Sequence, residues 1–129
     1  MLFAFVLASA LQLGAAAPAA DTLSGTWRVT GDVVGNPINE LCTLRQAGTK
    51  LTGSCKGADA DAQAYDVTGE VANGQVTFSH GGDYQGQTIT ITYAAPLASA
   101  TELKGTVDVQ PFGVGGTFTA APAPAPARP

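Results

Sequence analysis

The chain has 129 residues, of which 16 are glycine and only 12% are charged, and its net charge is −4. This length allows one domain. The composition excludes a coiled coil, a collagen and a charge-driven disordered chain. The acidic balance offers no basic surface for nucleic acid, so no nucleic-acid partner is expected.

The N-terminal segment is an apolar run over residues 2–13, broken only by Ser9 and Gln12 and followed by small residues. It is shorter than the roughly 20 residues that cross a bilayer. An apolar run before small residues is typical of a secretory signal. We therefore predict a signal peptide over residues 1–20, cleaved near residues 17–20, and a mature chain without a transmembrane segment. The expected location is the periplasm or the extracellular space.

Residues 21–120 are predicted to form one domain, because apolar and polar residues alternate there with a period of two. The Asn73-Gly74 pair is a strong hairpin signal, and Gly81-Gly82-Asp83 is also typical of a turn. The connections are short, so sequential strands should be antiparallel neighbours. The expected strands are residues 26–34, 38–46, 51–56, 65–71, 75–80, 85–93, 102–109 and 112–120.

Eight such strands, each with one apolar face, predict an all-β fold, and two architectures accommodate them. An antiparallel up-and-down barrel leaves no open sheet edge and is the preferred prediction. A two-sheet β-sandwich is the alternative. Residues 121–129 alternate alanine and proline, which favours an extended, disordered tail.

Two cysteines, Cys42 and Cys55, flank the hairpin turn expected near residues 47–50. With that turn they face each other across two strands, and both point to the inner face. In an exported protein this arrangement predicts a disulfide. A redox-active pair is the alternative, although the chain has no Cys-x-x-Cys motif to favour it.

Polar side chains with inward parity gather at one predicted end of the barrel, and the other end is apolar. Burying polar groups without partners costs a few kcal/mol each, so this end is either a solvated rim or a site that orients a small ligand. The residues expected at this mouth are Glu40, Tyr65, His80, Gln85 and Gln87. One histidine with Glu40 and Asp83 is a weak basis for a metal site, and no metal or cofactor is expected.

Glycines also fall on the inner face. They would either leave room for a ligand or allow aromatic rings to cross a narrow barrel. The inward glycines are Gly31, Gly53, Gly69, Gly105 and Gly116.

The first strand opens with Gly25-Thr26-Trp27, a G-x-W motif that resembles the calycin superfamily of lipocalins, fatty-acid-binding proteins and avidins. Residues 51–54 and 65–69 are also similar to the third and fourth strands of bacterial avidins. The resemblance implies an eight-stranded barrel with Trp27 at its closed end.

These features predict an exported barrel that binds a small hydrophobic or amphipathic ligand at its mouth. One alternative is a protein-interaction module of the cell envelope, such as a secreted protease inhibitor. A second alternative is a small enzyme that uses His80. Catalysis is not the expected function, because Ser79 points to the face opposite His80 and no G-x-S-x-G motif accompanies it.

Overall fold

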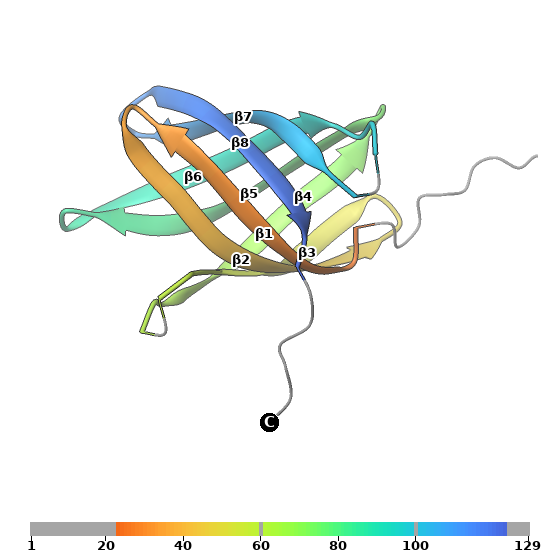
Figure 1. Ribbon diagram of the computed structural model, residues 1–129, viewed down its shortest axis with the longest axis horizontal. Coiled ribbons are helices and arrows are strands. Elements are labelled where there is room, and N and C mark those ends of the chain that lie inside the picture. The colour runs from red at the N-terminus through yellow and green to blue at the C-terminus, as the bar shows by residue number, and fades with distance from the viewer. Residues whose placement is uncertain (1–22, 60, 100, 124–129) are drawn as a thin grey trace, which may run out of the picture.

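The structure is a computed structural model that describes residues 23–59, 61–99 and 101–123. Every regular element in these residues is a strand, and the eight strands close into one antiparallel barrel in which each strand pairs with the next and β1 pairs with β8 (Figure 1). The predicted up-and-down barrel is therefore confirmed, and the sandwich alternative is wrong. The strands are β1 (Gly25–Val33), β2 (Asn36–Ala47), β3 (Lys50–Gly57), β4 (Ala64–Ala72), β5 (Gln75–Tyr84), β6 (Gln87–Pro96), β7 (Leu103–Gln110) and β8 (Val114–Pro122).

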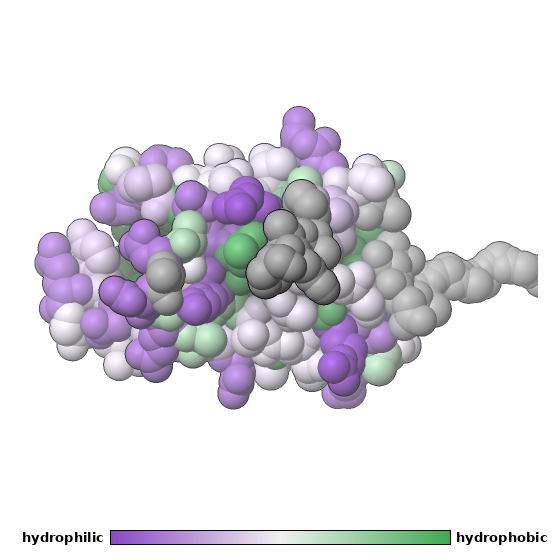
Figure 2. Space-filling model, turned by 60° about the horizontal axis from the view of Figure 1, so that its bottom comes forward, coloured by the Kyte–Doolittle hydropathy of each residue, from purple (hydrophilic) through white to green (hydrophobic). Residues whose placement is uncertain are grey.

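The expected signal peptide over residues 1–20 lies outside the described residues, as do residues 124–129 of the expected tail. Within the described ranges, no helix has the length and apolar character needed to cross a membrane. The outer face seen in Figure 2 is a mosaic of hydrophilic and near-neutral residues with small, separate apolar areas.

Two-residue turns connect β4 to β5 and β5 to β6, and each places both central residues at positive φ. Asn73 and Gly74, at φ 55° and 74°, form the hairpin that the sequence predicts. The second turn lies at Gln85-Gly86, with φ 51° and 82°, and not at residues 81–83 as expected. Glutamine is an uncommon residue at positive φ, so the sequence gives little signal for a turn there.

Strand β5 continues through Gly81 and Gly82. Glycine is common in turns, but its backbone can also adopt the extended conformation of a strand. Gly81, Gly82 and Asp83 pair with residues of β6, and the hairpin reaches four residues past His80. In Figure 1 this hairpin projects furthest at one end of the barrel. This extension decides which side chains surround the barrel mouth.

The last strand also ends later than expected. Strand β8 runs to Pro122, two residues past the predicted domain boundary at residue 120, and Ala121 and Pro122 pair with Arg28 and Trp27. The backbone N–H of Ala123 then donates to the carbonyl of Thr26 at 2.8 Å. The start of the Ala/Pro segment is thus part of the barrel wall.

Trp27 lies in the core near the start of β1, with only 2% of its surface exposed. Its indole Nε1 donates to the carbonyl of Leu23 at 2.9 Å, and the backbone N–H of Leu23 donates to Gln46 Oε1 at 3.1 Å. Leu23 is itself fully buried, so the segment before β1 packs into this end of the barrel.

The five inward glycines share one environment. A Cβ at any of these positions would overlap a backbone carbonyl oxygen of a neighbouring strand. The rings of Phe78, Tyr93 and Phe118 pack together at the centre, with centroids 4.9–6.5 Å apart. Phe78 covers Gly69, and Phe118 covers Gly31. The glycines therefore let the strands approach and the rings cross the barrel, which is the second of the two expected alternatives.

Candidate ligand site at the open end of the barrel

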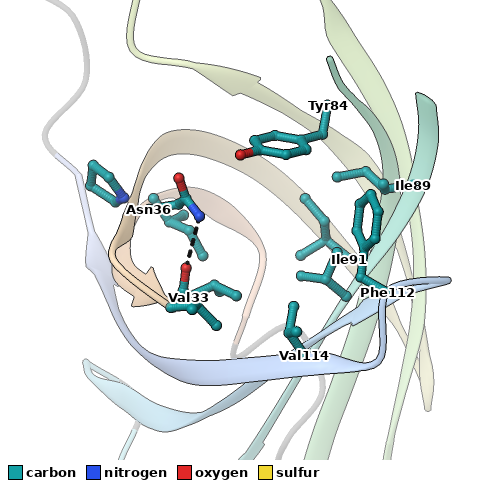
Figure 3. A pocket seen from close by; sticks show the side chains of 11 residues that line it. Val33, Asn36, Tyr84, Ile89, Ile91, Phe112 and Val114 are labelled. Carbon is teal, nitrogen blue, oxygen red and sulfur yellow. Dashed lines mark hydrogen bonds between the residues drawn. The ribbon is translucent and has the colours of Figure 1, made fainter. Parts of the chain in front are cut away.

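An open cavity of about 420 Å³ lies at the end of the barrel opposite Trp27. Three hairpins surround it: β1–β2, β5–β6 and β7–β8 (Figure 3). Its wall consists of Val33, Val34, Asn36, Pro37, Ile38, Tyr84, Ile89, Ile91, Val109, Phe112 and Val114. We refer to this cavity as the mouth pocket.

The mouth pocket is apolar, and none of the described residues on its wall has a charged side chain. Among these residues, only Asn36 and Tyr84 have polar side chains. Asn36 Nδ2 donates a hydrogen bond to the carbonyl of Val33 at 3.2 Å. The Oδ1 atom of Asn36 takes no part in that bond. In Figure 3 the Tyr84 hydroxyl points across the cavity toward Asn36. A molecule in this pocket would therefore contact apolar side chains on most of its surface. It could form side-chain hydrogen bonds only near Asn36 and Tyr84.

The rim of the mouth pocket is exposed and apolar. Each of the three hairpins places one large apolar side chain there: Val34 is 68% exposed, Tyr84 41% and Phe112 45%. The rings of Tyr84 and Phe112 meet edge to face, with centroids 6.0 Å apart. Large exposed apolar side chains gathered at one site are typical of a binding surface.

None of the five polar residues expected at the mouth lines this pocket. Gln85 and Gln87 are exposed at the tip of the β5–β6 hairpin, so neither is buried inside the barrel. Gln85 occupies the displaced turn. Gln87 pairs with Tyr84 at the tip, whereas the pairing of β6 with β7 begins only at Thr90, so its side chain extends past the barrel wall.

Glu40 and His80 do come together, inside the barrel. His80 Nε2 lies 2.9 Å from Glu40 Oε1, and both residues are less than 9% exposed. The hydroxyl of Tyr93, from the barrel centre, donates to Glu40 Oε2 at 2.9 Å. Tyr65 is half-buried, and its ring stacks beside His80 with centroids 6.2 Å apart. This polar cluster lies next to the mouth pocket, since His80 pairs with Ile91 and Glu40 is two residues from Ile38.

The surroundings shift the pKa of two groups in this cluster. Burial by itself would lower the pKa of His80, but the carboxylate of Glu40 and the carbonyl of Gly81 outweigh it, and the pKa is raised. Burial and the nearby Glu40 charge together raise the pKa of the Tyr93 phenol far above its ordinary value. Tyr93 therefore stays protonated and acts as a hydrogen-bond donor.

The predicted disulfide between Cys42 and Cys55 is confirmed. The two residues pair directly across β2 and β3, with Cα atoms 3.9 Å apart, and both are buried. Closing a loop of this size stabilises the fold by about 3 kcal/mol, chiefly by restricting the unfolded chain.

The apolar residues of the mouth pocket carried a signal in the sequence, although the predicted site was built on the polar residues of that end. Val33, Ile38, Ile89 and Val109 all have inward parity near the strand ends that meet at the mouth. Apolar inward residues that persist to the ends of several strands, at the end where Trp27 is not, would have indicated an apolar opening.

No protein-family model matches the chain, and no curated protein matches it either. Solved structures do match. A redesigned β-barrel, mFAP1, bound to DFHBI, has a TM-score of 0.56 and 15% identity and covers 78% of this chain and 94% of its own. A redesigned β-barrel, mFAP0, bound to DFHBI, has a TM-score of 0.54 and 17% identity, and the match covers 78% of this chain and 98% of that one. Another redesigned β-barrel has a TM-score of 0.59 and 16% identity, and the match covers 80% of this chain and 93% of that one.

These likenesses concern the fold, which is a closed eight-stranded antiparallel barrel. Identities of 14–17% carry no residue of those barrels over to this chain.

Proposed function

We propose that the protein is an exported barrel that binds a small apolar or amphipathic molecule in the mouth pocket. The observation that carries the proposal is the open cavity of about 420 Å³ with an apolar, uncharged wall. Small-molecule sites typically have volumes of about 300–1,000 Å³, apolar walls and a few placed polar groups. Asn36 and Tyr84 are polar groups of that kind. The similar barrels mFAP0 and mFAP1 hold a small molecule, DFHBI, which also supports the proposal.

Export is supported by the disulfide together with the expected signal peptide. Disulfides persist in oxidising compartments and are rare in the cytosol. Cys42 and Cys55 form such a bond.

The proposal is tested with N-phenyl-1-naphthylamine, an uncharged fluorophore that brightens in apolar surroundings. We expect saturable binding of one dye per chain. Replacing Val114 by tryptophan puts a bulky ring on the pocket wall, so Val114→Trp should lower the dye affinity at least tenfold. Native mass spectrometry of the protein purified from its host should also detect a bound small molecule.

The matched control is Thr90→Ala, which removes an exposed side chain on the outer face of β6. This variant should bind the dye as the wild type does. Circular dichroism verifies that both variants keep the barrel. Equal dye binding by the wild type and a folded Val114→Trp variant would contradict the proposal.

A second candidate function is a protein-interaction module of the cell envelope, and the exposed trio Val34, Tyr84 and Phe112 favours it. Interfaces are enriched in tyrosine and phenylalanine at their centres. If a folded partner uses this rim, Tyr84→Ala and Phe112→Ala should each weaken its binding while Thr90→Ala does not. We further propose that the protein is not an enzyme, since Ser79, the hydroxyl residue next to His80 in the chain, cannot share its face of β5.

A further inference from the structure

Two aromatic rings border the opening of the mouth pocket. Tyr84 ends β5, Phe112 lies in the turn between β7 and β8, and both rings stand beside the cavity in Figure 3. The two ring planes are nearly perpendicular, at 83°, and the residues are 41% and 45% exposed. The face of an aromatic ring is electron-rich and attracts cations. A cation at this opening could therefore lie against both rings.

Each of the three hairpins around the pocket also carries one exposed aspartate, directly before a residue of the pocket wall. The three are Asp32, Asp83 and Asp108. Asp32 accepts a hydrogen bond from the backbone N–H of Gly35 at 3.0 Å, and Asp108 accepts one from Gln110 Nε2 at 2.8 Å. Neither donor is charged. In the part of the chain that the structure describes, none of the three forms an ion pair with lysine or arginine.

These aspartates act on a ligand through their electric field and not by contact, since none of them lines the pocket. Consecutive Cα atoms are about 3.8 Å apart. Each carboxylate therefore lies within about one Debye length, about 8 Å, of the Cα atom of the wall residue that follows it. The hairpins add no opposing charge, because residues 32–38, 83–91 and 107–115 contain no lysine or arginine. The opening is therefore at negative potential.

The same surroundings give an anionic head group no charged partner. No lysine, arginine or histidine is among the described residues that line the pocket. His80 lies next to the pocket, but Glu40 Oε1, at 2.9 Å from His80 Nε2, compensates the charge of the protonated imidazole. The polar side chains of the wall, Asn36 and Tyr84, are uncharged. A carboxylate at the opening would in addition be repelled by the aspartates.

We propose that the mouth pocket is selective for cationic amphiphiles, which are molecules with an apolar body and an ammonium group. This inference rests on the proposed function and names the class of ligand. The apolar body lies against the uncharged wall, and the ammonium group stays at the rim beside Tyr84 and Phe112, within the field of the three aspartates. At the rim the cation keeps part of its hydration, so binding does not bury an unpaired charge.

The test compares three ligands that share a ten-carbon chain and differ in their head groups: decyltrimethylammonium, decanoate and uncharged 1-decanol. Each is titrated at neutral pH, below its micelle concentration, against the protein with N-phenyl-1-naphthylamine bound. At low ionic strength we expect decyltrimethylammonium to displace the dye at a concentration about tenfold lower than decanoate does. Added salt should narrow this difference and leave displacement by decanol unchanged.

The contribution of the rings is measured with Phe112→Leu, which keeps an apolar side chain at the rim and removes one ring face. The affinity for decyltrimethylammonium should fall about two- to fivefold relative to that for decanol, since this is the effect of one cation–π contact at an exposed site. The ratio of the two affinities is the readout, because a general loss of apolar contact would lower both.

The contribution of charge is measured with Asp83→Asn and with the variant in which all three aspartates become asparagine. The affinity for decyltrimethylammonium should fall about twofold in the first and about tenfold in the second at low ionic strength, with decanol unaffected. Glu70→Gln is the matched control. Glu70 is exposed and pairs with Thr77, six residues before Asp83, which is about 20 Å along β5. This control should bind all three ligands as the wild type does.

The proposed function and this inference fail in different ways. If neither the dye nor decanol binds, the proposed function is contradicted and the inference falls with it. If both bind but decanoate binds as tightly as decyltrimethylammonium or more tightly, the inference alone is overturned. It is also overturned if the preference for the ammonium ligand persists unchanged in both the folded Phe112→Leu variant and the folded triple aspartate variant.

Discussion

The buried carboxylate of Glu40 organises the polar interior of the barrel. It accepts a hydrogen bond from Tyr93 and lies against His80, the single histidine of the chain. Removing one member of a buried charged pair leaves the other without compensation, which costs about 3–5 kcal/mol. The tyrosine hydroxyl and the imidazole together offset the cost of burying this carboxylate.

The raised pKa of His80 predicts a specific pH dependence of stability while the disulfide is intact. The folded-state pKa of His80 lies above the ordinary histidine value of 6.5 because of Glu40 and the carbonyl of Gly81. Protonated His80 therefore stabilises the fold fully below about pH 6.5, and this contribution is lost as the pH rises through the folded-state value. Urea denaturation of the wild type and of His80→Gln across this range measures the difference. A difference that stays constant or grows with pH would contradict the assignment.

Each strand of the barrel depends on a close approach to its neighbours at the inward glycines. At Gly116 in β8, an added Cβ would overlap the carbonyl oxygen of Asp32 in β1 and lie within 3.0 Å of Val33 Cα. At Gly81 in β5, the nearest atom to an added Cβ is Tyr65 Cδ1 at 3.7 Å, an ordinary contact. The two glycines thus have different roles, although both lie in strands.

Gly116→Ala should therefore lower the free energy of unfolding by about 1–3 kcal/mol, because the strands β1 and β8 must move apart. Gly81→Ala is the matched control and should change the stability little, since the added methyl group makes only ordinary contacts, at 3.7 Å from Tyr65 Cδ1 and 3.8 Å from the carbonyl oxygen of Ile89. Chemical denaturation of both variants tests the pair. An equal loss in the two would show that the close approach at Gly116 is unimportant.

The whole molecule depends on the pairing of its first and last strands, since an open barrel would expose two sheet edges. This closure extends to the end of β8, where Pro122 pairs with Trp27 and Ala123 bonds to Thr26. The contacts at the end of β8 lie over the part of β1 that carries Trp27. Barrel closure and the packing of Trp27 are therefore coupled.

A chain that ends at residue 120 should be less stable than one that ends at residue 124. It loses two paired residues and the backbone hydrogen bond of Ala123. At about 1 kcal/mol for each backbone hydrogen bond, the loss should amount to about 1–3 kcal/mol. Thermal unfolding of the two truncated proteins measures it. Equal unfolding midpoints would show that residues 121–123 do not contribute to the stability of the barrel.

The sequence by itself determined that the domain has eight strands in antiparallel order, where most of them lie, and that Cys42 faces Cys55. Alternation with a period of two and short connections carry this information, and they favour a barrel over a sandwich without deciding the ends of β5, β6 and β8. The strongest turn, Asn73-Gly74, was also readable because its residues suit positive φ.

The tertiary structure alone decided how high each inward side chain lies along the barrel axis. That height depends on the stagger of every strand pair around the closed barrel, which no local pattern encodes. The displaced turn at Gln85-Gly86 carried Tyr84 to the mouth and the glutamines into solvent. Glu40 met Tyr93, 53 residues away, inside the barrel and not at the rim. The apolar mouth pocket exists for the same reason, because residues of three hairpins come together around it only in the closed barrel.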